Sequence, residues 1–165
     1  MTNEAALRGR IRFLLSFFIC ALVISGLTAI PLRYELRLLM QLIELGSQSG
    51  ITIPALSEWI EKINQGVQDG YGTYPFLAYG TDWLAFGHIS IAVAFLGPLR
   101  DPARNIWVVE FGMIACALIL PWTLIFGQIR GIPFFWQLID MSFGIFGIIP
   151  LWVVRRYIRR ISDKV

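Results

Sequence analysis

Residue types that carry chemistry are few in this chain, which has one histidine and two cysteines among its 165 residues. A single histidine cannot supply both axial ligands of a bis-histidine haem, and the lack of a Cys-x-x-Cys pair argues against thiol redox chemistry. No histidine, cysteine and carboxylate residues occur together at a spacing typical of metal ligands. We therefore predict neither a metal site nor a cofactor.

Charged residues are also scarce, at 15% of the chain, whereas hydrophobic residues make up 56%. The net charge of +3 arises mostly from arginines at the ends of apolar stretches, so it indicates membrane orientation and not a nucleic-acid surface. This composition is typical of a single membrane domain covering residues 1–165, with no room for a separate catalytic domain. Cys20 and Cys116 lie in apolar stretches, where a thiol usually serves as a small packing residue.

Four long apolar stretches are the main positive feature of the sequence. A helix on the surface of a water-soluble protein needs a polar face, and these stretches have almost none. About 20 apolar residues suffice to cross the hydrocarbon core of a bilayer. We predict an all-α integral membrane protein with four transmembrane helices, at about residues 12–31, 82–99, 102–128 and 133–155. The lipid bilayer is thus the first expected partner.

Prolines support these boundaries. Asp101 followed by Pro102 is typical of a helix that begins with an acidic N-cap and a proline in its first position, and Pro133 can begin the fourth helix similarly. Pro121 and Pro150 fall late in the third and fourth spans, where each removes a backbone hydrogen bond. We expect bends there, and bends of this kind are commonly structural in membrane helices.

Basic residues are distributed unevenly between the two sides of the predicted spans. Ten lie in the terminal segments and in the loop between the second and third spans, and four lie on the other side. The positive-inside rule therefore places both termini in the cytoplasm, and we expect the inner membrane of a bacterium. The ten are Arg8, Arg10, Arg12, Arg100, Arg104, Arg155, Arg156, Arg159, Arg160 and Lys164, and the four are Arg33, Arg37, Lys62 and Arg130.

The segment at residues 32–81 is too long for a turn and too polar for a further span. Its first part is apolar around most of its circumference and is expected to continue the first helix beyond Pro31 and to end at Gly46. Residues 55–67 predict an amphipathic helix that lies on the membrane or on the bundle. Residues 70–80 are rich in aromatic residues and turn formers, which suits an interfacial belt or a lid. We predict that the whole segment is extracytoplasmic.

Two polar residues fall at similar depth within different spans. His88 lies about 9 Å along the second span and Asp140 about 10 Å along the fourth, by the rise of an α-helix. If these spans are neighbours, the two side chains meet in the outer third of the bilayer. Such a site can bind a cation, an amine, a quinone or a lipid headgroup, or transfer a proton; alternatively, it is a hydrogen-bonded pair that holds two helices together.

Other residues are candidates for the same ligand-binding site. They are charged residues expected to surround its entrance and aromatic residues expected at the outer interface. These candidates are Asp82, Glu35, Arg130, Tyr79, Trp83 and Trp136.

Glu110 is a third polar residue within a span and belongs to the opposite side of the membrane. It lies near several arginines, so a structural ion pair is the favoured interpretation. The candidate partners are Arg100 and Arg104, with Arg12 and Arg155 as further options.

Three functions remain open at this point, because a four-span bundle by itself assigns none. The first is a non-catalytic accessory, assembly or scaffolding subunit that docks other membrane subunits or a second copy of itself. The second is a binder or carrier of a hydrophobic or cationic small molecule or lipid, which uses His88 and Asp140. The third is an enzyme that modifies a lipid or isoprenoid and uses the same two residues as acid and base.

Overall fold

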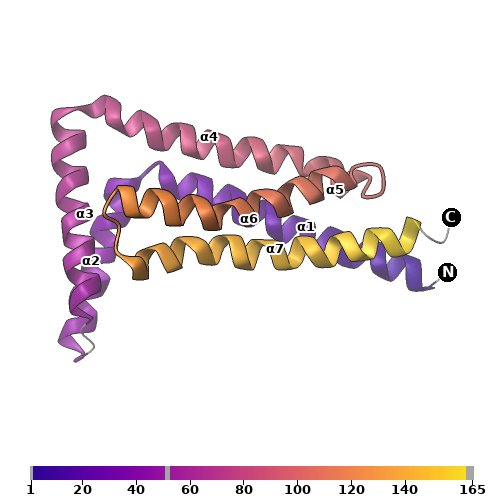
Figure 1. Ribbon diagram of the computed structural model, residues 1–165, viewed down its shortest axis with the longest axis horizontal. Coiled ribbons are helices and arrows are strands. Elements are labelled where there is room, and N and C mark those ends of the chain that lie inside the picture. The colour runs from indigo at the N-terminus through magenta and orange to yellow at the C-terminus, as the bar shows by residue number, and fades with distance from the viewer. Residues whose placement is uncertain (1, 51–52, 163–165) are drawn as a thin grey trace. The chain divides into compact units, whose positions relative to one another are not determined.

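The computed structural model describes residues 2–50 and 53–162, and within these ranges the secondary structure is helical, without strands (Figure 1). The prediction of an all-α chain with four helices able to cross a membrane is confirmed. The four stretches that are long and apolar enough are Glu4–Ala29, Pro75–Arg100, Ile106–Ile129 and Phe134–Ser162. The elements in chain order are α1 (Thr2–Ala29), α2 (Leu32–Gln48), α3 (Pro54–Thr73), the 3-10 helix η1 (Pro75–Ala78), α4 (Tyr79–Ala94), α5 (Leu96–Arg100), α6 (Ile106–Ile129) and α7 (Phe134–Ser162).

The chain forms two compact units. The first, unit 1, comprises Met1–Leu22 and Ile91–Val165, and the second, unit 2, comprises Val23–Ser90. The division falls inside α1 and α4, so each of these helices contributes one part to each unit.

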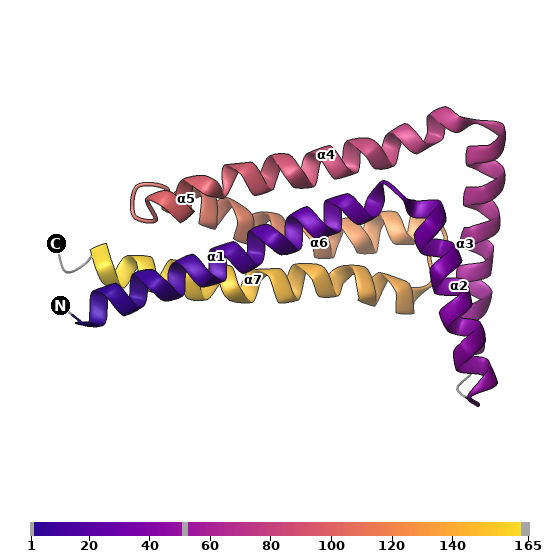
Figure 2. The ribbon, with the colours of Figure 1, turned by 180° about the vertical axis from the view of Figure 1, so that it is seen from behind.

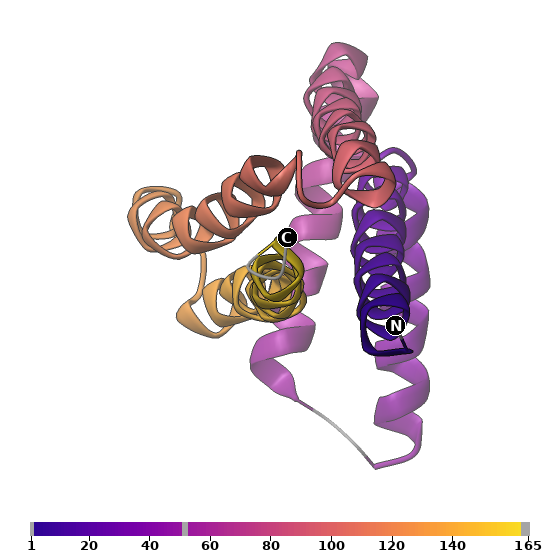
Figure 3. The ribbon, with the colours of Figure 1, turned by 90° about the vertical axis from the view of Figure 1, so that its right-hand side faces the viewer.

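In unit 1, α6 and α7 form an antiparallel pair and lie side by side (Figures 1 and 3). Small residues allow their close approach, as is common between membrane helices. A Cβ atom added to Gly144 would lie 2.5 Å from the carbonyl oxygen of Cys116, and one added to Gly112 would lie 2.9 Å from a methyl carbon of Leu151 on α7. Cys116 is buried in this core as a packing residue, whereas Cys20 is exposed on α1.

The core of unit 1 joins α1 to the α6–α7 pair, and the start of α1 and the end of α7 lie at the same end of this unit (Figure 2). Phe18 on α1 and Phe95, which follows α4, have ring centroids 4.8 Å apart. The buried members of the core are Ile11, Leu15, Phe18, Phe95, Val108, Val109, Cys116, Leu151, Val154, Ile158 and Ile161.

The third span begins later than predicted, at Ile106 instead of Pro102. The Asp101 carboxylate accepts a hydrogen bond from the backbone N–H of Arg104 at 3.1 Å, and the Asn105 amide donates to the Asp101 carbonyl at 2.9 Å. These bonds stabilise a local turn, so Asp101 does not cap a helix that starts at the next residue. Pro133 does not occupy the first helical position as predicted, because α7 begins one residue later, at Phe134. Its carbonyl still accepts the first hydrogen bonds of that helix, from Trp136 at 2.9 Å and Gln137 at 3.1 Å.

The terminal helices extend beyond the predicted spans. α1 begins at Thr2 and α7 continues to Ser162, so the arginines at these ends remain helical. A charged side chain can stay in a helix where that helix leaves the hydrocarbon, since its charge reaches the headgroup layer. α6 and α7 also continue through Pro121 and Pro150. Lys164 lies outside the described residues.

In unit 2, α2 is a separate helix, so the expectation that the first helix continues beyond Pro31 is wrong. The chain turns at residues 30 and 31 (Figure 2), and the Pro31 carbonyl then accepts from the N–H groups of Tyr34 at 2.7 Å and Glu35 at 3.1 Å. Proline has no N–H to extend α1, while its carbonyl is free to begin a new helix. α2 also ends later than Gly46, at Gln48, because the left-handed backbone that ends it is supplied by Gly50, with φ 80°.

α2 and α3 run antiparallel and form a hairpin outside the four candidate spans (Figures 1 and 2). The predicted amphipathic helix at residues 55–67 is present as the longer α3. The aromatic segment at 70–80, for which an interfacial belt or a lid was predicted, is mostly helical, since α3 ends at Thr73, η1 follows, and α4 begins at Tyr79. The backbone N–H of Tyr74 donates to the Gly70 carbonyl at 2.8 Å, which shows that helical bonding continues through these glycines.

Candidate functional site

His88 lies on α4 in unit 2, where its ring is bonded within its own helix. Its Nδ1 is 2.8 Å from the carbonyl oxygen of Leu84. A carbonyl oxygen only accepts, so Nδ1 carries the proton of this bond. The helix of His88 also passes close to α1, because a Cβ atom added to Gly26 would lie 2.9 Å from the Cβ of His88. In unit 2, His88 therefore has a role in helix packing.

Asp140 lies on α7 in unit 1 and is half-buried. Among the described residues of unit 1 it makes no hydrogen bond or ion pair. It stands between Gln137, which packs against Gly127 of α6, and Gly144, which packs against the carbonyl of Cys116. An intramembrane carboxylate without a partner is unusual and is a candidate for function by default. His88 and Asp140 belong to different units, so their pairing stays a prediction.

The other candidates for the ligand-binding site are divided between the two units. Glu35 lies on α2, and Tyr79, Asp82 and Trp83 lie in the first turns of α4, where the rings of Tyr79 and Trp83 meet edge to face with centroids 5.9 Å apart. Arg130 follows the last residue of α6, and Trp136 lies one turn before Asp140 on α7. The common pocket expected from the sequence therefore stays a prediction as well.

Glu110 forms an ion pair between α6 and α7. Its Oε1 lies 2.7 Å from Nε of Arg155 and 3.4 Å from Nη2 of Arg159. Arg100 and Arg104 are not partners of Glu110 among the described residues. The sequence analysis did not name Arg159 as a partner of Glu110, although its spacing of four residues from Arg155 puts both arginines on one face of α7. The pair holds the two helices together at one end of unit 1.

Gln137 is a buried polar residue that the sequence analysis did not single out. It is 2% exposed, its Nε2 donates to the Ile132 carbonyl at 2.7 Å, and its Oε1 has no hydrogen-bond partner among the described residues. It packs against Gly127, where an added Cβ atom would lie 2.5 Å from the Gln137 amide carbon. Gln137 thereby fixes the connection between α6 and α7. The only sequence signal was an uncharged amide at the start of an apolar stretch.

The α2–α3 hairpin has one apolar and one polar outer face. Exposed apolar side chains follow each other along α2 at helical spacing, and we call them the α2 stripe: Tyr34 (73% exposed), Leu38 (58%), Leu42 (55%) and Leu45 (59%). The face of α2 opposite to this stripe packs against α3 through Leu36, which is buried. α3 instead exposes Glu58, Glu61, Lys62 and Asp69. No part of the hairpin is among the four candidate spans.

Arg33 joins the two helices of the hairpin. Its Nη2 donates to the carbonyl oxygen of Gln68 at 3.0 Å, while its buried Nε has no hydrogen-bond partner among the described residues. The side chain lines a hollow of about 300 Å³ together with Tyr34, Tyr71 and Pro75. Arg33 thus serves the hairpin structurally, which the sequence did not indicate.

Comparison with known proteins adds no family: no family model, curated protein or solved structure matches this chain. The class of the protein therefore comes from its own fold, which is that of a helical protein with four helices able to cross a membrane. Within residues 2–50 and 53–162, no three histidine, cysteine or acidic side chains gather as a metal site would require.

Proposed function

We propose that this chain is a non-catalytic subunit of a membrane complex, and that it docks another membrane protein through the α2 stripe. One observation carries this proposal: an amphipathic helix outside the spans exposes Tyr34, Leu38, Leu42 and Leu45 over three turns. Lipid would cover the apolar exterior of the spans, and in this proposal α2 lies outside the hydrocarbon, where its apolar side chains need a protein partner. A contiguous apolar patch of this kind marks an interaction surface.

The charge of the hairpin favours a protein partner over the membrane surface. Residues 32–73 contain three basic and five acidic side chains, which gives a net charge of −2. Helices that lie on anionic membranes are instead rich in lysine and arginine on their polar face. The stripe also begins with a tyrosine, a residue type enriched at the centres of protein interfaces.

The polar groups within the spans support a structural chain more than a catalytic one. The His88 ring bonds to Leu84 in its own helix, and Glu110 bonds to Arg155 and Arg159. The His88 bond lies within α4 and the Glu110 bonds join α6 to α7, so both groups already have partners in the structure. A lipid-modifying enzyme would need His88 and Asp140 together as acid and base, and no observation favours that function.

We also propose that both termini are cytoplasmic, that the membrane is the inner membrane of a bacterium, and that the α2–α3 hairpin is extracytoplasmic. The support is the excess of arginine at the end of unit 1 where α1 begins and α7 ends, together with the acidic hairpin. Alkaline phosphatase fused after Gln48 is expected to be active, and the same enzyme fused after Ser162 inactive. The reverse pattern would refute this orientation.

Site-specific crosslinking tests the docking proposal. A photo-reactive amino acid at Leu42 should give one discrete protein adduct in native membranes, and the adduct should disappear when Leu38→Glu is added. The same amino acid at Glu61, on the polar face of α3, is the matched control and should give none. Adducts to lipid alone at Leu42, or equal adducts at both positions, would overturn the proposal.

A second function is favoured by Asp140, a carboxylate that makes no hydrogen bond or ion pair among the described residues of unit 1. A hydrophobic molecule that carries an amine would supply the missing positive charge at this depth. If so, Asp140→Asn should abolish retention of a hydrophobic amine dye by the purified protein and leave its thermal midpoint in detergent nearly unchanged. If the parent protein retains no dye and Asp140→Asn lowers the thermal midpoint, Asp140 serves only in packing.

A further inference from the structure

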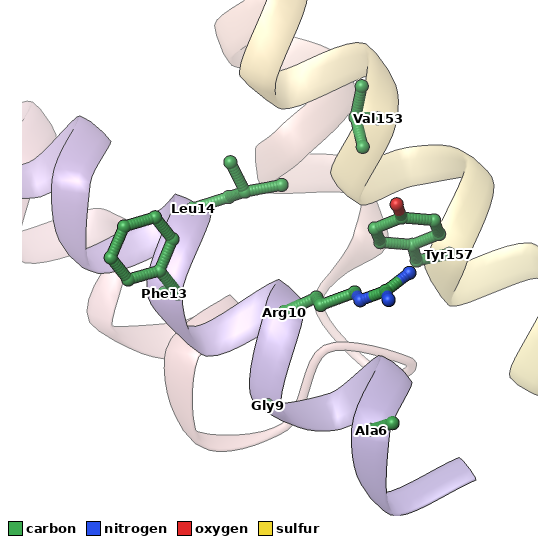
Figure 4. A pocket seen from close by; sticks show the side chains of 7 residues that line it. All are labelled: Ala6, Gly9, Arg10, Phe13, Leu14, Val153 and Tyr157. Atoms are coloured by element: carbon green, nitrogen blue, oxygen red, sulfur yellow. The ribbon is translucent and has the colours of Figure 1, made fainter. Parts of the chain in front are cut away.

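A cavity of about 530 Å³ opens between the first turns of α1 and the last turns of α7, both in unit 1 (Figure 4). Its lining residues are Ala6, Gly9, Arg10, Phe13, Leu14, Val153 and Tyr157. Ala6 and Gly9 leave space at the start of α1, because one has a single methyl group and the other has no side chain. A Cβ atom added to Gly9 would meet nothing within 4 Å.

The lining is polar in one part and apolar in another. Ala6 and Gly9 lie nearest the start of α1, Arg10 and Tyr157 supply the polar groups that follow, and the Arg10 guanidinium extends toward Tyr157 across the cavity (Figure 4). Phe13 and Leu14 lie one turn further into α1, and Val153 lies one turn further into α7. A molecule that fits this order has a polar group at the helix ends and a hydrocarbon chain that points into the membrane.

The charge at this cavity is positive and uncompensated. Arg8 pairs with Glu4 at 2.8 Å, and Arg155 and Arg159 share Glu110. Arg10 has no acidic partner in the part of the chain that the structure describes. A guanidinium is well suited to bind phosphate oxygens, and a tyrosine hydroxyl can donate a further hydrogen bond.

From this placement we infer that the cavity between α1 and α7 binds an anionic phospholipid of the leaflet at which the two termini lie. The phosphate bonds to the Arg10 guanidinium and the Tyr157 hydroxyl, and one acyl chain runs along Phe13, Leu14 and Val153. The apolar half of the lining favours a lipid over free phosphate, since a small anion would leave that half uncovered. This inference is independent of the docking surface on α2.

Lipid binding by the full chain tests the inference. The protein in a neutral detergent is incubated with phosphatidylglycerol or with phosphatidylcholine of the same chain length, and bound lipid is counted by native mass spectrometry. We expect phosphatidylglycerol to be retained in preference. Arg10→Gln should weaken its binding about fivefold, as the loss of one arginine at an anionic lipid surface implies.

Arg12→Gln is the matched control, because Arg12 is an exposed arginine on the same helix that does not line the cavity. It should change the affinity less than twofold. Gly9→Leu should block binding of both lipids, since a Cβ atom at this position meets nothing within 4 Å and the larger side chain takes up space in the cavity. Inorganic phosphate at millimolar concentration should not displace the lipid.

Three results would overturn the inference. These are equal retention of the two lipids, equal effects of Arg10→Gln and Arg12→Gln, and retention that Gly9→Leu leaves unchanged. If inorganic phosphate displaces the bound lipid as effectively as added phosphatidylglycerol does, the cavity is an anion site that has no place for the acyl chain. Thermal midpoints measured for each variant separate loss of binding from loss of folding.

Discussion

At the scale of single residues, the sequence predicted the role of one polar group within the spans and missed another. Glu110 was correctly expected to form an ion pair, because a carboxylate in a span needs a neutralising partner. The two favoured partners, Arg100 and Arg104, were wrong, and Arg155 had been only a further option, since the choice depends on the register of α6 against α7. The sequence analysis missed Gln137, because an uncharged amide in a sequence is only weak evidence for a buried polar group. Once the side chain is buried, its amide needs a hydrogen-bond partner.

The Glu110–Arg155 pair gives a prediction at this scale. Both side chains are partly exposed, at 38% and 28%, so solvent weakens their attraction. A double-mutant cycle with Glu110→Gln and Arg155→Gln should give a coupling energy of about 1 kcal/mol in detergent unfolding. The same cycle with Arg100→Gln in place of Arg155→Gln should give a coupling near zero. Equal coupling for both arginines would contradict the observed register of α6 and α7.

At the scale of helices, the sequence predicted the four spans because length and apolar composition are local properties. The breaks were harder to predict. Whether Pro31 bends a helix or ends it depends on where its carbonyl finds a donor, and Tyr34 supplies one. Asp101 has the residue type of a helix cap, yet it bonds to Arg104 in a turn that ends before Ile106. Both outcomes depend on hydrogen bonds between residues that propensity rules treat separately.

Contact between α6 and α7 gives a prediction at the scale of helices. Gly144→Ala would place a methyl group 2.5 Å from the backbone carbonyl of Cys116, so the helices must separate. We expect a loss of about 1–3 kcal/mol in the free energy of unfolding. Gly66→Ala is the control, because α3 leaves open space at Gly66, and there alanine should be neutral or stabilising by about 0.5–1 kcal/mol. Thermal unfolding of both variants in detergent measures the difference, and equal losses would contradict the close packing.

At the scale of the whole molecule, the chain combines four helices that are long and apolar enough to cross a membrane, among the described residues, with a hairpin that exposes an apolar stripe on α2. Sequence analysis located that hairpin as a polar segment with an amphipathic helix at 55–67, but it did not find the exposed stripe on α2. The reason is that the sequence analysis treated α2 as apolar around most of its circumference, whereas its polar residues make it amphipathic. Which apolar face stays exposed becomes clear only from the burial of Leu36 on the opposite face. The site expected around His88 and Asp140 draws on both units and stays a prediction.

The most direct measurement of the proposed function is the mass of the assembly released from native membranes by a mild detergent. We predict a defined complex of this chain with a second membrane protein, reduced at least tenfold by Leu38→Glu with Leu42→Glu and unchanged by Glu58→Gln with Glu61→Gln. The chain should remain folded in all three forms, as its thermal midpoint will show. A stable monomer of the parent chain under the same conditions, or a complex that the α2 variant leaves intact, would contradict the account.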